Sequence, residues 1–210
     1  MPANYDNSAW FYDRLSRLIY GDALVRAQVY LLGFIPENAK VLIAGGGTGW
    51  ILEKLADVHP AGLQITYAEV SAKMMAQAKK RNTGDNAVVF VNEEGEKFRS
   101  PTNLDVVITP FLFDSFTMQS TERLFKHIDS LLKPAGLWLY ADFQLTGKWW
   151  QKTLLKSMLL FFKILCGIES SKLPDVESLF KLNAYKTIAE KTFLNDFVIS
   201  KVYIKNQGVF

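Results

Sequence analysis

The chain has 210 residues, of which 49% are hydrophobic and 21% charged, and its formal net charge is +3. This composition is typical of a soluble globular protein, and because the basic residues form no stripe, we expect no nucleic-acid partner. One cysteine excludes an internal disulfide, and with only two histidines we expect no metal site built from His and Cys. The N-terminal residues do not resemble a secretory signal, so we expect a cytoplasmic protein.

Strand-like and helix-like segments alternate through the middle of the chain. Strands are expected at 40–45, 63–69, 87–91, 104–109, 137–143 and 196–205. Helices are expected at 50–58, 71–82 and 121–133. Continuous β-branched runs are typical of strands that are covered on both faces. The order therefore predicts an α/β fold with a doubly wound, mostly parallel sheet.

A glycine-rich turn follows the first expected strand, in VLIAGGGTGW (41–50). Gly45, Gly47 and Gly49 are spaced G-x-G-x-G, which lets a backbone approach a ligand closely, although the same glycines would also fit a plain tight turn. Position 50 is Trp, so the dinucleotide fingerprint is incomplete, and the ending of a phosphate-binding P-loop is absent. Glu69 ends the second strand, where a carboxylate can accept hydrogen bonds from a ribose diol. Together these features favour an adenosine-bearing ligand.

Five segments resemble, in order and spacing, the motifs of class I S-adenosylmethionine-dependent methyltransferases. They are VLIAGGGTGW, YAEVSAKMMAQAKKR, FVNEEGEKF, LDVVITPFLFDSF and LLKPAGLWLYADF. The N-terminal AWFYDRLSRLIYG is similar to the helix before the core in methyltransferases of ubiquinone and menaquinone biosynthesis. The resemblance implies a Rossmann-like methyltransferase core with N-terminal helices, a helical insert before the last strand, and S-adenosylmethionine as cofactor.

The resemblance also implies roles for single residues. The three glycines would face the methionine part and the ribose, Glu69 would hold the ribose hydroxyls, and Val70 would lie against the adenine. Glu94, with Gly95 beside it, stands where the family often has an acid that accepts from the adenine amino group, although it could also be a solvated loop charge. Thr109 would line the methionine side, near the transferred methyl.

One position departs from the family pattern. An acid that helps to hold the cofactor's ammonium usually stands two residues before the first glycine, and this chain has Ile43 there. Tyr12 and Asp13 could contribute that contact instead. Ile43 also leaves open a non-catalytic binding protein with the methyltransferase fold. A further alternative is an aminopropyltransferase, but that family needs an aspartate after the fourth strand, where this chain has Thr109 and Pro110.

The acceptor is expected to be a small, hydrophobic or aromatic molecule. Methyl transfer from a sulfonium needs alignment and a dry pocket, so no catalytic triad is required. A hydroxyl or amine acceptor would need a general base, for which Asp114 is the candidate, although an N-cap role fits it equally well. Phe111, Phe113 and Trp150 are the candidate substrate contacts. The amphipathic stretch 148–167 would pack on the sheet, cover the acceptor or rest on a membrane surface.

The whole chain, 1–210, is expected to form a single domain. Its parts would be an N-terminal helical segment (1–39), a cofactor-binding core (40–146), a helical insert or lid (147–192) and a terminal strand (193–210). A lid of this kind should line a mostly hydrophobic cavity that opens toward Thr109 and Asp114. Because only NQGVF follows the last expected strand, we predict six strands and at most a stub of a seventh.

Overall fold

The computed structural model describes residues 6, 19–93, 103–168 and 170–206. Its strands are β1 (Lys40–Ala44), β2 (Ala61–Ala68), β3 (Asp85–Val91), β4 (Leu104–Pro110), β5 (Leu132–Phe143), β6 (Tyr185–Phe193) and β7 (Val198–Lys205). Its helices are α2 (Ala23–Leu32), α3 (Trp50–Val58), α4 (Ala72–Ala78), α5 (Met118–Leu131), α6 (Trp149–Cys166) and α7 (Val176–Leu182), with the 3-10 turn η2 (Phe113–Ser115).

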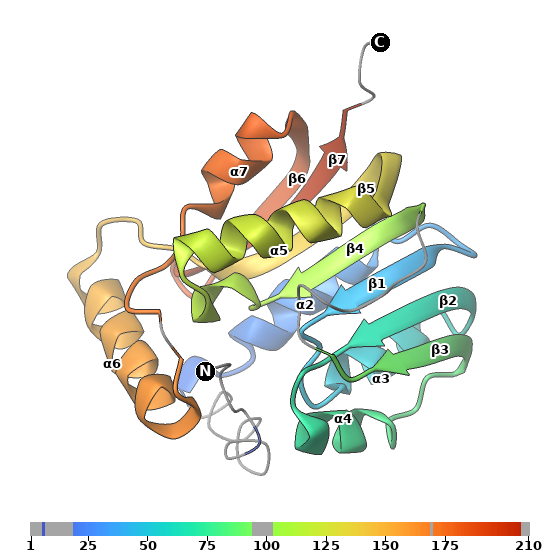
Figure 1. Cartoon of the computed structure of the whole chain (residues 1–210), viewed down its shortest axis with the longest axis horizontal. Helices are drawn as coiled ribbons and strands as arrows, with labels where there is room; N and C mark the ends of the chain where they lie inside the picture. The colour runs from blue at the N-terminus through green and yellow to red at the C-terminus, as the bar shows by residue number, and fades with distance from the viewer. Residues whose placement is uncertain (1–5, 7–18, 94–102, 169, 207–210) are drawn as a thin grey trace.

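The seven strands form one sheet in the order β3-β2-β1-β4-β5-β7-β6 (Figure 1). The first five strands pair in parallel, and β7 runs antiparallel to both of its neighbours, β5 and β6. β1 lies between β2 and β4, so the chain changes direction across the sheet at this strand. In open α/β sheets, ligands bind at such a switch point, beyond the carboxyl ends of the strands.

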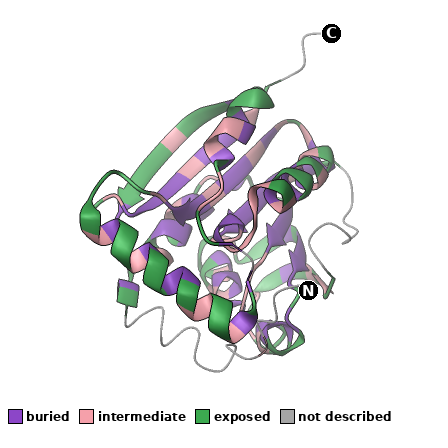
Figure 2. Cartoon of the chain, turned by 60° about the vertical axis from the view of Figure 1, so that its left-hand side comes forward, coloured by how far each residue is buried: buried purple, intermediate pink, exposed green. Residues whose placement is uncertain are grey.

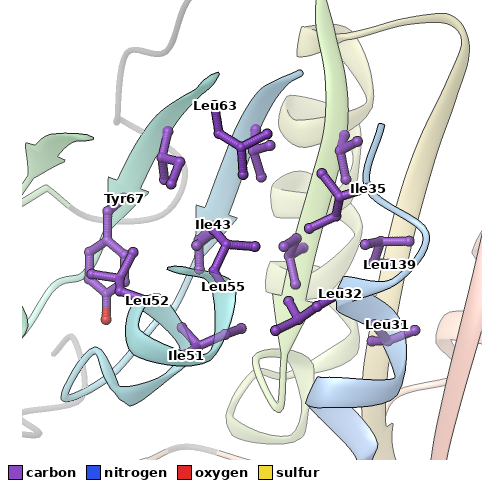
Figure 3. Packing of buried hydrophobic residues seen from close by; sticks show 14 of the residues in the cluster. Leu31, Leu32, Ile35, Ile43, Ile51, Leu52, Leu55, Leu63, Tyr67 and Leu139 are labelled. Atoms are coloured by element: carbon purple, nitrogen blue, oxygen red, sulfur yellow. The ribbon is translucent and has the colours of Figure 1, made fainter. Parts of the chain in front are cut away.

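Helices cover both faces of the sheet, which explains the continuous apolar run of β1. Ile43 points into a cluster with α2 and α3, whereas Leu42 points into a second cluster with α5 and α7. Figure 3 shows Ile43 close to Leu55 of α3 in the first cluster. The position at which the family pattern has an acid is therefore completely buried among apolar side chains.

The doubly wound α/β fold is as predicted, and the expected strands and helices lie where the sequence placed them. α3 has the predicted bounds, and the Ser71 hydroxyl caps α4 by accepting a hydrogen bond from the Met74 N–H at 3.1 Å. α5 begins earlier than expected, at Met118, because Thr117 caps it by accepting from the Ser120 N–H.

The strand count is a correction: within the described residues the sheet has seven strands instead of six. β6 lies in the stretch for which the sequence predicts a helical insert. It is an edge strand with mostly exposed residues between its ends (Figure 2), so its sequence lacks the apolar alternation of a half-buried strand. The turn to β7 includes Leu194, Asn195 and Asp196, all with positive φ.

α6 lies beyond the end of the sheet at which the parallel strands finish (Figure 1). Its buried side chains, among them Leu155 and Met158, form a third apolar cluster with the start of α2 and with Phe143 and Val198 of β5 and β7. Among the described helices, none is both long and apolar enough to cross a membrane.

Candidate active site

A cavity of about 170 Å³ lies at the carboxyl ends of β1, β2 and β4, and we call it the glycine-loop cavity. Its walls include residues from the loop after β1, from the end of β2 and from the turn after β4. Among them are Gly45, Gly46, Gly47, Glu69, Val70, Pro110, Phe111 and Asp114. The structure thus brings two of the three predicted glycines, the predicted acid of β2 and Asp114 to one cavity.

The glycine loop is held by hydrogen bonds from three sides. The Tyr67 hydroxyl donates to the Gly47 carbonyl at 2.9 Å, and the Gly47 N–H donates to Glu69 Oε2 at 2.9 Å. Arg81 Nε donates to the Thr48 carbonyl at 3.1 Å. These hydrogen bonds hold the loop in a conformation that presents its backbone to the cavity.

Glycine is needed at the three positions for different structural reasons. Gly45 and Gly47 both line the cavity with φ of 72° and 64°, and no atom lies within 4 Å of where a Cβ on Gly47 would stand. Gly49, which is predicted as a cofactor contact, does not line the cavity. A Cβ on Gly49 would lie 2.6 Å from the Cα of Ala78, so this glycine allows α3 to pack closely on α4.

Glu69 is 6% exposed and lines the cavity from the end of β2. Its two oxygens accept from the backbone N–H groups of Gly47 and Ser71, the latter at 2.8 Å. Burial raises the pKa of this carboxyl, and the backbone donors partly oppose the rise. Each oxygen keeps a second lone pair, so the carboxylate can still accept from a ligand's hydroxyls. Val70 also lines the cavity.

Thr109 does not reach the cavity, in contrast to its predicted role. Its side chain is completely buried, and its hydroxyl accepts from Trp138 Nε1 at 2.9 Å. The reason is that β4 continues through Pro110, so the strand ends one residue later and Pro110 lines the cavity instead. The predicted contacts Tyr12, Glu94 and Gly95 lie outside the described residues.

A second cavity of about 230 Å³ lies under α6, and we call it the α6 cavity. α6 contributes four apolar side chains to its wall: Leu154, Met158, Phe161 and Phe162. Its other walls come from Ile19 and Tyr20 before α2, from α2, from β5 and from the turn after β4. Its polar lining residues are Tyr20, Asp114 and Ser157. It reaches Asp114, as predicted for a lid, but not Thr109.

The two cavities share part of their walls. Phe111, Asp114 and Phe162 line both of them. Phe111 has a φ of 51°, which is unusual for a bulky residue, and its N–H donates to the Ala141 carbonyl at 2.7 Å. The turn after β4 thus holds an aromatic ring and a carboxyl group between the glycine loop and α6.

Two predicted substrate contacts lie away from both cavities. Phe113 is buried on the opposite side of the η2 turn, and its ring centroid lies 6.5 Å from that of Trp138. Trp150 packs edge-on against Phe197 at 5.6 Å, in the apolar cluster at the start of α6. In a helical turn, neighbouring side chains point in different directions, so Phe111 and Asp114 face the cavities while Phe113 faces the core.

Asp114 is 9% exposed, and burial raises its pKa to about 7. Ser115 Oγ donates to its Oδ1 at 2.9 Å, which stabilises the charged form. The alternative role of Asp114 as the N-cap of the following helix is not observed, because Thr117 caps α5. A carboxyl group with this pKa is suited to take up a proton near neutral pH.

Sequence reasoning did not find Tyr20 and Asp142. Asp142, in β5, is 2% exposed and accepts from the backbone N–H groups of Phe143, Phe113 and Asp114. Burial and the charge of Asp114 raise the pKa of Asp142 well above its ordinary value. An acid at the end of the apolar run LWLYADF repeats the signal that pointed to Glu69, and could have been used. Tyr20 carries no comparable signal.

Comparison with known proteins identifies the domain. A family model described as a methyltransferase domain matches residues 41–136. The chain is similar to the malonyl-[acyl-carrier protein] O-methyltransferase 2 of Ilyobacter polytropus, with 29% identity over 116 residues, which are 53% of this chain and 44% of the relative. The chain thus spans less than half the length of this curated relative.

Solved structures share the whole fold. A chain of the complex between the Haloferax volcanii Trm112 methyltransferase activator and a methyltransferase has a TM-score of 0.70 at 14% identity, covering 99% of this chain and 100% of that chain. The 1,6-didemethyltoxoflavin-N1-methyltransferase of Burkholderia thailandensis, whose structure holds 1,6-didemethyltoxoflavin and S-adenosylhomocysteine, has a TM-score of 0.63 at 14% identity, with 95% and 88% covered. Residues 41–136 thus match a methyltransferase domain, and the chain shares its fold with S-adenosylmethionine-dependent methyltransferases of known structure.

Proposed function

We propose that this protein transfers the methyl group of S-adenosylmethionine to a small, hydrophobic or aromatic acceptor that binds in the α6 cavity. The observation that carries this proposal is the wall that Phe111, Asp114 and Phe162 contribute to both cavities. A donor in one cavity and an acceptor in the other would meet at this wall. Such alignment is the main contribution that a protein makes to a displacement of this kind.

The residues of the glycine-loop cavity fit the cofactor. Gly47 leaves open space where a side chain would stand, and the Glu69 carboxylate lies where it can accept from ribose hydroxyls. Val70, which is partly exposed, offers an apolar surface for the adenine. When bound, S-adenosylmethionine would supply an electrophilic methyl group on sulfur.

The residues of the α6 cavity would prepare the acceptor. Met158, Phe161 and Phe162 exclude water, which keeps the acceptor atom unsolvated before it reacts. Asp114 would hold the proton of the acceptor at a carboxylate oxygen. The acyl-carrier substrate named for the Ilyobacter relative is not part of this proposal, because the chain covers only 44% of that protein. Methyl transfer is preferred over aminopropyl transfer because the family model describes a methyltransferase domain.

A pair of glycine substitutions tests the cofactor site. Gly47 and Gly147 both have positive φ, of 64° and 89°, and open space where a Cβ would stand, but only Gly47 lines the cavity. Both Gly47→Ala and Gly147→Ala should lose about 1–2 kcal/mol of stability through backbone strain. Only Gly47→Ala should also weaken binding of S-adenosylhomocysteine, because its methyl group enters the ligand's space.

The measurements are calorimetric titration with S-adenosylhomocysteine and thermal unfolding of both variants. Gly147→Ala is the control for strain without a change in the cavity. Equal affinity of the two variants would overturn the cofactor assignment. If the wild-type protein binds S-adenosylhomocysteine but yields no methylated product from a pool of hydrophobic metabolites, the non-catalytic alternative is favoured.

A further inference from the structure

We infer that the α6 cavity takes an uncharged apolar acceptor through a hydroxyl or N–H group, and that it discriminates against an acceptor that presents a carboxylate. The inference rests on the proposed function, since it assigns the acceptor's chemical class at the same site. It is carried by a buried donor, a buried acceptor and the lack of a cation among the described lining residues.

The donor is the hydroxyl of Tyr20, which lines the α6 cavity. Tyr20 is 5% exposed. The centroid of its ring lies 5.3 Å from the ring centroid of Phe143 and 6.5 Å from that of Phe197. Its hydroxyl oxygen is buried and has no hydrogen-bond partner in the described part of the chain. A buried polar group without a partner is costly, so a ligand atom that pairs with this hydroxyl explains its place.

The hydrogen-bond acceptor is the carboxyl group of Asp114 in the same cavity wall. Ser115 occupies one side of this group, and the carboxyl retains further lone pairs. A hydroxyl acceptor needs one group that accepts its proton and one group that donates to its oxygen. Asp114 and Tyr20 supply this combination between apolar walls.

The charges around the cavity oppose a carboxylate. No lysine, arginine or histidine is found among the described residues that line either cavity. Asp142 accepts from the Asp114 N–H, so a second buried carboxyl group lies next to the first and adds no positive charge. A carboxylate acceptor would lose its water beside Asp114 without gaining an opposite charge from a described side chain of the lining.

The bonds and the proton of the transfer step are accounted for when the acceptor is a hydroxyl or an N–H group. The acceptor's oxygen or nitrogen forms a bond to the methyl carbon, while the carbon–sulfur bond breaks and its electron pair stays on sulfur. The proton of the acceptor passes to Asp114. A carboxylate has no proton to give, so it would make no use of the base that this cavity provides.

Two probes with one aromatic skeleton test the inference, 2-naphthol and 2-naphthoate. Each is titrated calorimetrically into the full chain saturated with S-adenosylhomocysteine, at a pH at which the naphthol is neutral and the naphthoate ionised. We expect 2-naphthol to bind at least about tenfold more tightly. Asp114→Asn should weaken 2-naphthol and strengthen 2-naphthoate, a reversal that a merely structural loss would not produce.

Tyr20→Phe is paired with Thr121→Val, because Thr121 in α5 also has a buried hydroxyl without a partner among described residues, and it lines neither cavity. Both variants should fold, since each removes an unsatisfied group. Only Tyr20→Phe should weaken 2-naphthol, by about five- to tenfold.

Several results would overturn the inference. These are tighter binding of 2-naphthoate, binding of neither probe, unchanged 2-naphthol affinity in Tyr20→Phe, or equal losses in both hydroxyl variants. Any of them, found together with normal binding of S-adenosylhomocysteine, leaves the proposed methyl transfer intact. Failure of the wild-type protein to bind S-adenosylhomocysteine contradicts the proposed function itself, and the inference with it.

Discussion

The proposed role of Asp114 as a base conflicts with the stability of the folded state. A base must be deprotonated to accept a proton, but burial of its charge lowers the stability of the fold. The pKa of Asp114 is raised from 3.8 to about 7, so the folded state binds its proton more tightly than the unfolded state does. Stability should therefore fall as the pH rises through this window, and it should stay low above it.

This effect can be measured by urea unfolding between pH 4 and 7. In the wild-type protein, the contribution of Asp114 to the free energy of unfolding should fall by up to about 4 kcal/mol, and Asp142 should act in the same direction. Asp114→Asn should flatten the profile. An unchanged slope in this variant would show that ionisation of Asp114 costs the folded state little free energy.

Asp105 provides the control with the opposite sign. Burial raises its pKa, but the ammonium of Lys133 and the N–H of Lys40 outweigh burial and hold the pKa below the usual value. Its contribution to stability is present above the unfolded pKa and is lost as the pH falls. Between pH 4 and 7 that contribution is nearly complete, so Asp105→Asn should lower stability by a nearly constant amount there and leave the decline with rising pH in place.

At the level of single residues, the sequence could predict groups that end strands. Gly47, Glu69 and Asp114 follow or end apolar runs, so their place at the carboxyl edge of the sheet follows from topology. Thr109 does not line the cavity because β4 is one residue longer than its apolar pattern suggested. Tyr20, which precedes α2, could not be found, because its place beside the turn after β4 depends on tertiary packing.

α6 has an outer face that differs from the face toward its cavity. Trp149, Leu160 and Ile164 are exposed there, together with three exposed lysines: Lys152, Lys156 and Lys163. α6 contains no acidic residue. Contact with a membrane surface through 148–167 thus stays a prediction, with an anionic lipid surface as the partner that suits its charge.

Vesicle sedimentation tests this contact. Vesicles with phosphatidylglycerol should retain the protein better than vesicles of phosphatidylcholine alone. Replacement of the three lysines by glutamine should weaken binding by up to about 3 kcal/mol, because each lysine near an anionic surface contributes about 1 kcal/mol. The same three replacements at Lys54, Lys73 and Lys79 give a control of equal charge. Equal losses would indicate an effect of net charge alone.

Over the whole molecule, β7 closes the core and β6 protects its edge. Val202 of β7 is completely buried in the cluster with α2 and α3, whereas Ile188 of β6 is 49% exposed. Val202→Asp should cost several kcal/mol because it buries an unpaired charge, and Ile188→Asp should change stability by only about 0.5 kcal/mol. Thermal unfolding of both variants decides this, and similar melting temperatures would contradict the assignment of β7 as a core strand.

The sequence could predict the doubly wound core because its strands are buried on both faces. It could not predict β6, because an edge strand with exposed polar side chains has no apolar period. For the same reason, the sequence predicts a helical insert over the stretch 147–192, in which most of β6 lies. The sequence feature that could have indicated β6 is the turn that follows it, because Asn195 and Asp196 are residue types that tolerate positive φ.

The antiparallel course of β7 brings the two ends of a long segment together. Phe143 pairs with Val198, and the Gln144 N–H donates to the Phe197 carbonyl at 2.9 Å. The segment between them contains α6, α7 and β6, so the chain leaves the sheet after β5 and rejoins it as the edge strand β6. Insertions in the loop between β5 and β6 add little closure entropy. During evolution, this segment can be lengthened, shortened or exchanged, and acceptor choice can diverge while the glycine loop is inherited unchanged.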